Sequence, residues 1–167
     1  MISEKINEAI NRQINKEFYS GYLYLSMSAY LRESGLFGFA QWTKLQAEEE
    51  VQHGTKLFNY LIDRKGTVNL EQIAKPEFNF NSPIEIFKFI YEHEKSVTKS
   101  VMEIAEEAED ECDRMTLMFM DWYINEQVEE EYNVHKIIEK LSRFGEDGSA
   151  LYLIDKEAGE RTAQKID

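Results

Sequence analysis

A glutamate and a histidine stand one helical turn apart on a stripe that is otherwise apolar. In EEEVQH, residues 48–53, Glu50 and His53 are separated by three positions and so share one helix face. The same face carries Trp42 and Leu57, which predicts that it turns toward a core. Glutamate oxygens and an imidazole nitrogen are ligands suited to iron, manganese or zinc. The pair therefore predicts part of a metal site, to which other segments would add carboxylates.

Three other apolar stripes carry polar groups at matching positions. Glu17 and Glu94 each interrupt such a stripe, and Gln127 and Glu130 form a second pair spaced by three residues. The separations repeat, because 50 − 17 and 127 − 94 both equal 33, whereas 53 − 17 and 130 − 94 both equal 36. Two helical hairpins of the same construction would bring these side chains to one level of a bundle.

Several carboxylates at one level of an apolar core need compensation. Burying one unpaired charge costs several kcal/mol, and neighbouring like charges add to that cost. Bound cations would neutralise the group, and a shared carboxylate could bridge two of them. Taken singly, Glu17 is more often a surface residue and His53 a core histidine, so the prediction depends on the four stripes together. Glu49, Glu126 and Glu129 lie beside them, either as further ligands or as a solvated acidic edge.

Helical periodicity covers most of the chain and supplies the elements that would position these groups. It predicts four long helices and a short fifth one, over residues 3–33, about 39–65, 82 to within 106–113, 114–144 and 150–159. The break before the second helix is SGLFG. SPIE at 82–85 has the pattern of a capping box with proline at the first helical position. Gly66 is expected at the C′ position after the second helix.

The connections predict the topology. Short links make the first two helices antiparallel, and likewise the third and fourth. Residues 67–81 lack periodicity, and these 15 residues can extend over about 45 Å, the length of a helix of about 30 residues. A crossover of this length would make the second and third helices parallel. We therefore predict an all-α, single-domain chain over 1–167, a four-helix bundle with a long crossover and a short C-terminal helix.

Composition narrows the function classes. Of 167 residues, 43% are hydrophobic and 31% charged, and the net charge of −13 disfavours nucleic acid and anionic membranes as partners. No apolar run approaches the length of a membrane span, and MISEKINEAI lacks the apolar core of a signal peptide. The lone Cys112 cannot form an intrachain disulfide and fits a reducing compartment. These features predict a cytoplasmic protein.

At this point the sequence resembles the ferritins, and within them the bacterial non-haem type. The resemblance covers nearly the whole chain and is carried by NKEFYSGYLYLSMSAY at 15–30 and FAQWTKLQAEEEVQHGTKLFNYLIDRKG at 39–66. It implies one iron held by Glu17, Glu50 and His53. It implies a second iron held by Glu50, Glu94 and Glu130, with Glu50 bridging the two. Gln127 would hydrogen-bond to the site.

The resemblance also implies the roles of neighbouring residues. A third iron site would use Glu49, Glu126, Glu129 and Glu130. Tyr24 and Trp122 would lie near the irons, where each either donates an electron or simply packs in the core. Haem is not expected, because Val51 stands where a haem-binding relative has methionine.

The implied activity is oxidation of Fe(II) by O₂ or peroxide at an intrasubunit di-iron centre. The Fe(III) would be stored as ferric oxyhydroxide inside a cage of 24 identical chains, with the short fifth helix at the four-fold axes. A DNA-associated miniferritin is the main alternative, but residues 145–167 and the net charge of −13 argue against it. A catalytically inactive structural subunit is a second alternative, and the complete set of five ligands argues against that. A rubrerythrin-like peroxidase is a third, but its Cys-rich rubredoxin domain cannot be built with one cysteine.

Overall fold

The computed structural model describes residues 2–76, 80–145 and 147–164, and all regular structure in these residues is helical. The helices are α1 (Glu4–Glu33), α2 (Phe37–Asp63), α3 (Pro83–Asp110), α4 (Arg114–Phe144) and α5 (Gly148–Ala158). The prediction of an all-α chain is confirmed, and the break before α2 is shorter than SGLFG because the helix begins at Phe37. None of the described helices combines the length and apolar character needed to cross a membrane.

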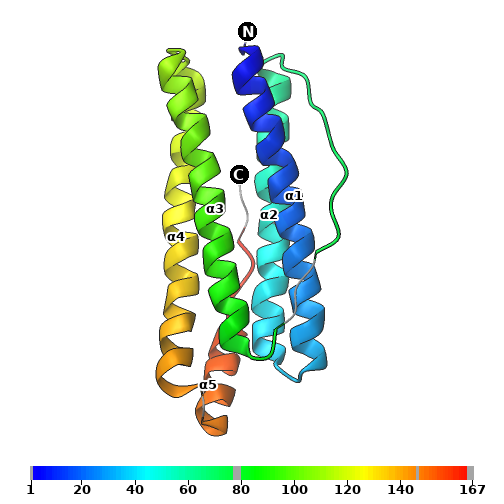
Figure 1. Cartoon of the computed structure of the whole chain (residues 1–167), viewed down its shortest axis with the longest axis vertical. Helices are drawn as coiled ribbons and strands as arrows, with labels where there is room; N and C mark the ends of the chain where they lie inside the picture. The colour runs from blue at the N-terminus through cyan, green and yellow to red at the C-terminus, as the bar shows by residue number, and fades with distance from the viewer. Residues whose placement is uncertain (1, 77–79, 146, 165–167) are drawn as a thin grey trace.

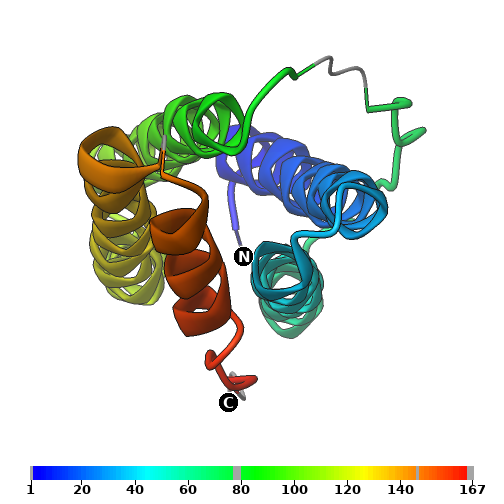
Figure 2. The ribbon, with the colours of Figure 1, turned by 90° about the horizontal axis from the view of Figure 1, so that it is seen from below.

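The four long helices form a bundle in which α2 and α3 run parallel. Figure 1 shows α1 and α2 as one antiparallel pair and α3 and α4 as another, with the link after α2 descending beside α1. Viewed from below, α5 lies between the ends of α2 and α4 (Figure 2), and it packs against both. The predicted long crossover and short C-terminal helix are therefore confirmed.

A ladder of asparagines on α1 holds the first part of the crossover. The three side chains recur every fourth residue, about 6 Å apart on a helix, which nearly matches the rise of two extended residues, about 6.6 Å. Each side-chain oxygen accepts a hydrogen bond from a backbone N–H of the link. The pairs are Asn7 with Thr67, Asn11 with Asn69 and Asn15 with Glu71, at 2.8, 2.7 and 2.8 Å. Alternate backbone N–H groups of the link thus find hydrogen-bond acceptors on α1, as they would on a neighbouring β-strand.

Two of the expected helix-end signals differ from the structure. Lys65 (φ 59°) occupies the left-handed C′ position after α2, not Gly66. Gly66 donates its N–H to the Leu61 carbonyl at 2.8 Å, as the C″ residue of a Schellman motif does. A Cβ at Gly66 would lie 2.4 Å from Asn7 Oδ1, so glycine permits the close approach to α1.

The capping box predicted at the start of α3 is only half recognisable. Pro83 does occupy the first turn, but the Ser82 side chain makes no capping hydrogen bond. Glu85 reaches one residue further back than the motif requires and accepts from the Asn81 N–H at 2.9 Å.

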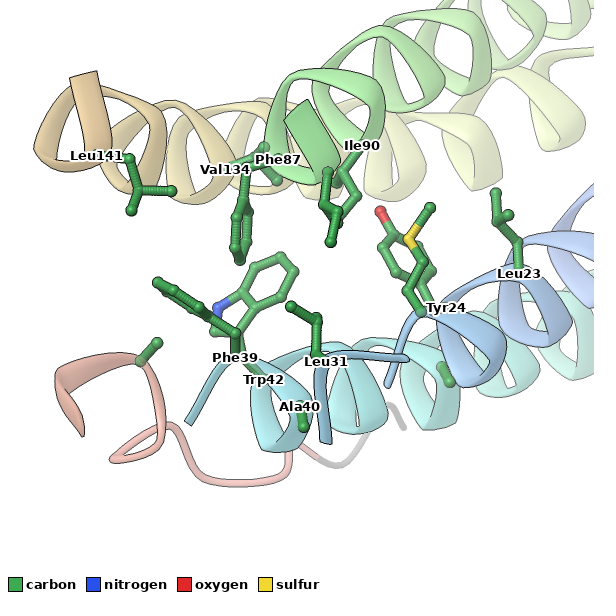
Figure 3. Close-up of a cluster of buried hydrophobic side chains, with 14 of the residues drawn as sticks. Leu23, Tyr24, Leu31, Phe39, Ala40, Trp42, Phe87, Ile90, Val134 and Leu141 are labelled. Carbon is green, nitrogen blue, oxygen red and sulfur yellow. The ribbon is translucent and has the colours of Figure 1, made fainter. Parts of the chain in front are cut away.

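The apolar core is divided into two clusters, one toward each end of the bundle. The cluster near α5 includes Phe39, Trp42 and Phe87 (Figure 3), and the cluster at the opposite end includes Ile10, Leu57 and several residues of α3 and α4. On every long helix the polar residues identified from the sequence fall between these clusters. The bundle therefore carries one polar layer across its middle.

Helix α5 supplies the N-terminal cap of α2. The N-cap residue of α2, Leu36, has no side-chain oxygen, and two N–H groups of the first turn are bonded instead by Asp155. The Asp155 carboxylate accepts from Gly38 N–H at 3.0 Å and from Phe39 N–H at 2.8 Å. A Cβ on Gly38 would meet the Asp155 carbonyl, so glycine allows α5 to lie this close.

We expect Asp155→Ala to lower the free energy of unfolding by about 1–2 kcal/mol, the usual effect of losing a helix cap and its favourable charge. The lost carboxylate leaves two buried N–H groups of α2 without an acceptor. Thermal and urea unfolding would measure the change. Glu160→Ala removes an exposed carboxylate from the same end of the chain and serves as the control. Equal stability of the two variants would contradict this role for Asp155.

Candidate metal centre

The polar layer gathers buried ligand side chains from all four long helices. Its members are each at most 6% exposed, and they are Glu17 from α1, Glu50 and His53 from α2, Glu94 from α3, and Gln127 and Glu130 from α4. Carboxylates are rarely this deeply buried unless they are paired or bind a metal ion. The matching separations of 33 and 36 residues thus correspond to a shared level in the structure.

Glu17, Glu50 and His53 form the tightest group. One potential ligand atom from each lies within 4.8 Å of the others, and no other three acidic, histidine or cysteine side chains do so among the residues the structure describes. His53 Nδ1 is 3.4 Å from Glu50 Oε2. A divalent cation could be coordinated by these three side chains with little rearrangement.

Two glutamines, not assigned a role from the sequence, orient the carboxylates of this group. Gln13 Nε2 donates to Glu17 Oε1 at 2.8 Å, and Gln46 Nε2 donates to Glu50 Oε1 at 3.1 Å. Each glutamine stands four residues before its glutamate, and 46 − 13 again equals 33. That repeated spacing is the sequence signal that could have identified them. Their amides fix one oxygen of each carboxylate. The other oxygen of Glu17 has no hydrogen-bond partner among the described residues, and that of Glu50 faces His53.

The α3–α4 side of the layer centres on Glu94. The Tyr24 hydroxyl donates to Glu94 Oε1, and Gln127 Nε2 donates to Glu94 Oε2 at 3.2 Å. Gln127 also donates to Thr98 Oγ1 at 3.2 Å, and Thr98 in turn donates to Glu131 Oε1 at 2.6 Å. Both Glu94 oxygens therefore accept hydrogen bonds that favour the carboxylate form.

Two oxygens in the layer have no hydrogen-bond partner among the described residues. They are Glu17 Oε2 and Glu130 Oε2, and both are fully shielded from solvent. Buried acceptors are nearly always satisfied in folded proteins, so such exceptions call for a specific explanation. A cation bound between the helices would provide the missing partner for both.

The pKa values of the buried carboxylates also favour a bound cation in the layer. Burial, followed by the proximity of Glu50, raises the pKa of Glu17 well above its usual range. Burial and the proximity of Glu94 raise the pKa of Glu50 to about 8 and that of Glu130 well above its usual range. Burial also raises the pKa of Glu94. Without a metal ion the layer holds protons, and a cation would have to displace them.

Aromatic side chains surround His53. Its ring lies edge-to-face against Trp122, with centroids 5.5 Å apart, and the Tyr123 hydroxyl donates to the His53 carbonyl at 2.8 Å. Lys56 Nζ lies 4.5 Å from the Trp122 ring centroid. Tyr24 is fully buried, and its hydroxyl is the one aromatic group bonded directly to a candidate ligand carboxylate in the described part of the chain.

The acidic residues beside the layer divide by environment. Glu49 is buried and pairs with Arg161, Glu126 is half-buried, and Glu129 is exposed. Burial raises the pKa of both Glu49 and Glu126, and the nearby Glu129 carboxylate raises that of Glu126 further. Glu48 and Val51 are exposed on the outer face of α2. Glu49 and Glu126 are therefore the more buried acidic residues beside the layer, and Glu129 is the exposed one.

Comparisons with known proteins give concordant matches. A family model described as a ferritin-like domain matches residues 7–144. Bacterial non-heme ferritin of Staphylococcus aureus is 38% identical over 162 residues, covering 97% of this chain and 98% of the relative. Bacterial non-heme ferritin of Bacteroides fragilis is 39% identical over 161 residues, covering 96% of this chain and all of the relative.

Solved structures show the same bundle. A closed form of the Archaeoglobus fulgidus ferritin, engineered by site-directed mutagenesis, superposes with a TM-score of 0.95 at 46% identity, covering 98% of this chain and all of that one. A humanized archaeal ferritin gives a TM-score of 0.97 at 46% identity, covering 99% of this chain and all of that one. These similarities extend from the first helix through α5.

Proposed function

The chain belongs to the ferritin family, an iron-storage family, and we propose that it oxidises Fe(II) at the buried centre and stores the product as a ferric mineral. One iron would be held by Glu17, Glu50 and His53, and the second by Glu50, Glu94 and Glu130, with Glu50 between them. Gln127 would orient Glu94. Iron is the substrate here, and the centre is where it reacts.

The observation that carries this proposal is the set of four buried carboxylates at one level with a single basic partner. Within the described residues, His53 is the only basic side chain that pairs with any of them, through Glu50. Four carboxylates and one imidazole suit two divalent cations in charge and in ligand number. They form the donor set known from di-iron carboxylate bundles, in which helices contribute glutamates and a Glu-x-x-His pair.

The chemistry follows from hard oxygen ligands around two ions. Carboxylates favour Fe(III) over Fe(II), so they promote loss of one electron from each ion. The balanced step is 2 Fe(II) + O₂ + 2 H⁺ giving 2 Fe(III) + H₂O₂, and peroxide could serve as the oxidant in place of O₂. Each hydrated Fe(III) then loses three protons to become FeOOH. The Tyr24 hydroxyl, which donates to Glu94, would help to hold that carboxylate in its ligand position.

The proposal extends to assembly and to a third ion. Storage requires an enclosed volume, which a cage of 24 chains with α5 at the four-fold axes would provide. Glu49, Glu126, Glu129 and Glu130 would form a third iron site on the inner side of the centre. Haem has no role in this scheme, and neither nucleic acid nor membrane is needed as a partner.

The experiment that tests the function combines particle mass with iron oxidation. Light scattering on the purified protein should give about 473 kDa, which is 24 chains of 19.7 kDa. Fe(II) added without oxygen and then exposed to air should produce ferric absorbance far faster than buffer alone, and the iron should stay with the particle. Zn(II) added first should compete for the same ligands and slow the reaction.

Other outcomes would identify the alternatives. A dodecamer would favour the miniferritin reading. A 24-chain particle that oxidises Fe(II) no faster than buffer would indicate a structural subunit, and would contradict the assigned centre.

A further inference from the structure

The segment that follows α5 returns along α2 and reaches the edge of the candidate metal centre. Figure 1 shows this part of the chain rising from α5 beside α2. Its contacts follow one stripe of α2, formed by Trp42, Gln46, Glu49 and Gln52 at spacings of three and four residues. The Gln52 side chain donates to the Gln164 carbonyl at 3.5 Å, which ties down the last described residue.

Arg161 is held in place by three partners on that stripe. Its Nη2 bonds to Glu49 Oε2, and its Nη1 donates to Gln46 Oε1 at 2.7 Å. The guanidinium carbon lies 4.7 Å from the centroid of the Trp42 ring, within range of a cation–π interaction. Only 16% of the Arg161 side chain is exposed. The Arg161 guanidinium is therefore held in a fixed position and is mostly shielded from solvent.

Glu49 is the acidic residue that Arg161 neutralises, and it has one oxygen left over. Glu49 is 4% exposed, and its Oε1 is buried without a hydrogen-bond partner among the described residues. Glu126 on α4 and His53 are close enough to influence its ionisation. Glu49 thus has one oxygen paired with the Arg161 guanidinium and a second, buried oxygen without a hydrogen-bond partner among the described residues.

We propose that Arg161 keeps metal ions off Glu49, so that the centre holds two ions and a third binds only when Arg161 is displaced. This inference rests on the function proposed above. A divalent ion at Glu49 would share the carboxylate with a fixed positive charge, and at short range in a partly dry site that repulsion is large. Glu49 therefore acts as a conditional ligand, and the C-terminal segment sets how many ions bind.

Arg161 is also linked, through Gln46, to Glu50, the carboxylate proposed to bridge the two irons. Gln46 accepts from Arg161 through Oε1 and donates to Glu50 through Nε2. An amide has one acceptor end and one donor end, so the bond from Arg161 fixes which end faces Glu50. Displacement of Arg161 by a third ion would release this constraint on Glu50.

The test counts metal ions by anaerobic Co(II) titration, followed by calorimetry and by the visible absorption of bound Co(II). Wild-type protein should bind two Co(II) per chain tightly and a third weakly. Arg161→Gln should tighten the third ion at least about tenfold, because the competing charge is gone. Arg161→Lys keeps the charge and should stay near wild type. Lys140→Gln removes another cation, one that pairs with Glu157, and should leave binding unchanged.

A double variant assigns the extra ion to its ligand. Arg161→Gln combined with Glu49→Gln should lose the third ion and keep the first two. The inference is overturned if wild type and Arg161→Gln bind the third ion with equal affinity, or if the double variant retains it. Failure of the proposed function looks different, since wild type would then bind no tight Co(II) pair at all. Circular dichroism and particle mass of each variant show whether it has folded and assembled.

Discussion

Glu50→Ala is expected to slow Fe(II) oxidation by more than about 100-fold, because changing even an outer partner of a metal ligand often costs 10–100-fold. Glu50 is the one carboxylate assigned to both irons. It lies within the tight group with Glu17 and His53, and its Oε1 is oriented by Gln46 at 3.1 Å. Removing it breaks the link between the two ions, so the electrons can no longer be delivered to one oxidant as a pair.

Initial rates of ferric absorbance, at two Fe(II) per chain, would measure this loss. His53→Ala should also slow the reaction, but less, because it removes a ligand of one ion only. Glu48→Ala is the matched control, since Glu48 is two residues away and faces solvent. The particle mass of each variant should equal that of wild type. Wild-type rates for both Glu50→Ala and His53→Ala would refute the assignment.

Much of the bundle could be predicted from the sequence because helices convert spacing into position. A rise of about 1.5 Å per residue means that ligands 33 and 36 residues apart in two similar hairpins must reach the same level. Spacing alone therefore predicted, without any knowledge of contacts, that four carboxylates share one level of the bundle: Glu17, Glu50, Glu94 and Glu130. The same logic predicted the crossover, since only an extended link of this length reaches the other end of the bundle.

The features that the sequence did not predict depend on contacts between distant segments, which leave no periodic pattern in the sequence. Arg161 lies 112 residues from Glu49 along the chain, on a segment without helical spacing, so nothing in the sequence pairs them. Asp155 caps α2 from 116 residues away in the same manner. Gly66 was misassigned because glycine is common at C′, whereas here it is required for the close approach to Asn7.

The metal-free protein should lose stability as the pH rises from about 4.5 toward 8, and metal ions should restore it. Burial raises the pKa of Glu50 to about 8 in the folded chain, against an ordinary value near 4.5. In that interval the folded state binds more protons than the unfolded state, so the free energy of unfolding falls with increasing pH. This contribution is complete below the ordinary pKa and is lost as the pH rises through the folded one.

Midpoints of thermal unfolding at pH 5, 6.5 and 8, with and without Zn(II), would test this. Zn(II) replaces the protons on the buried carboxylates, so its stabilising effect should grow from pH 5 to pH 8. Glu50→Gln is the informative control, because it keeps the shape and removes the titrating group. Its metal-free unfolding midpoint should depend less steeply on pH than that of wild type. Identical pH profiles for the two proteins would mean that Glu50 does not carry a proton in the metal-free centre.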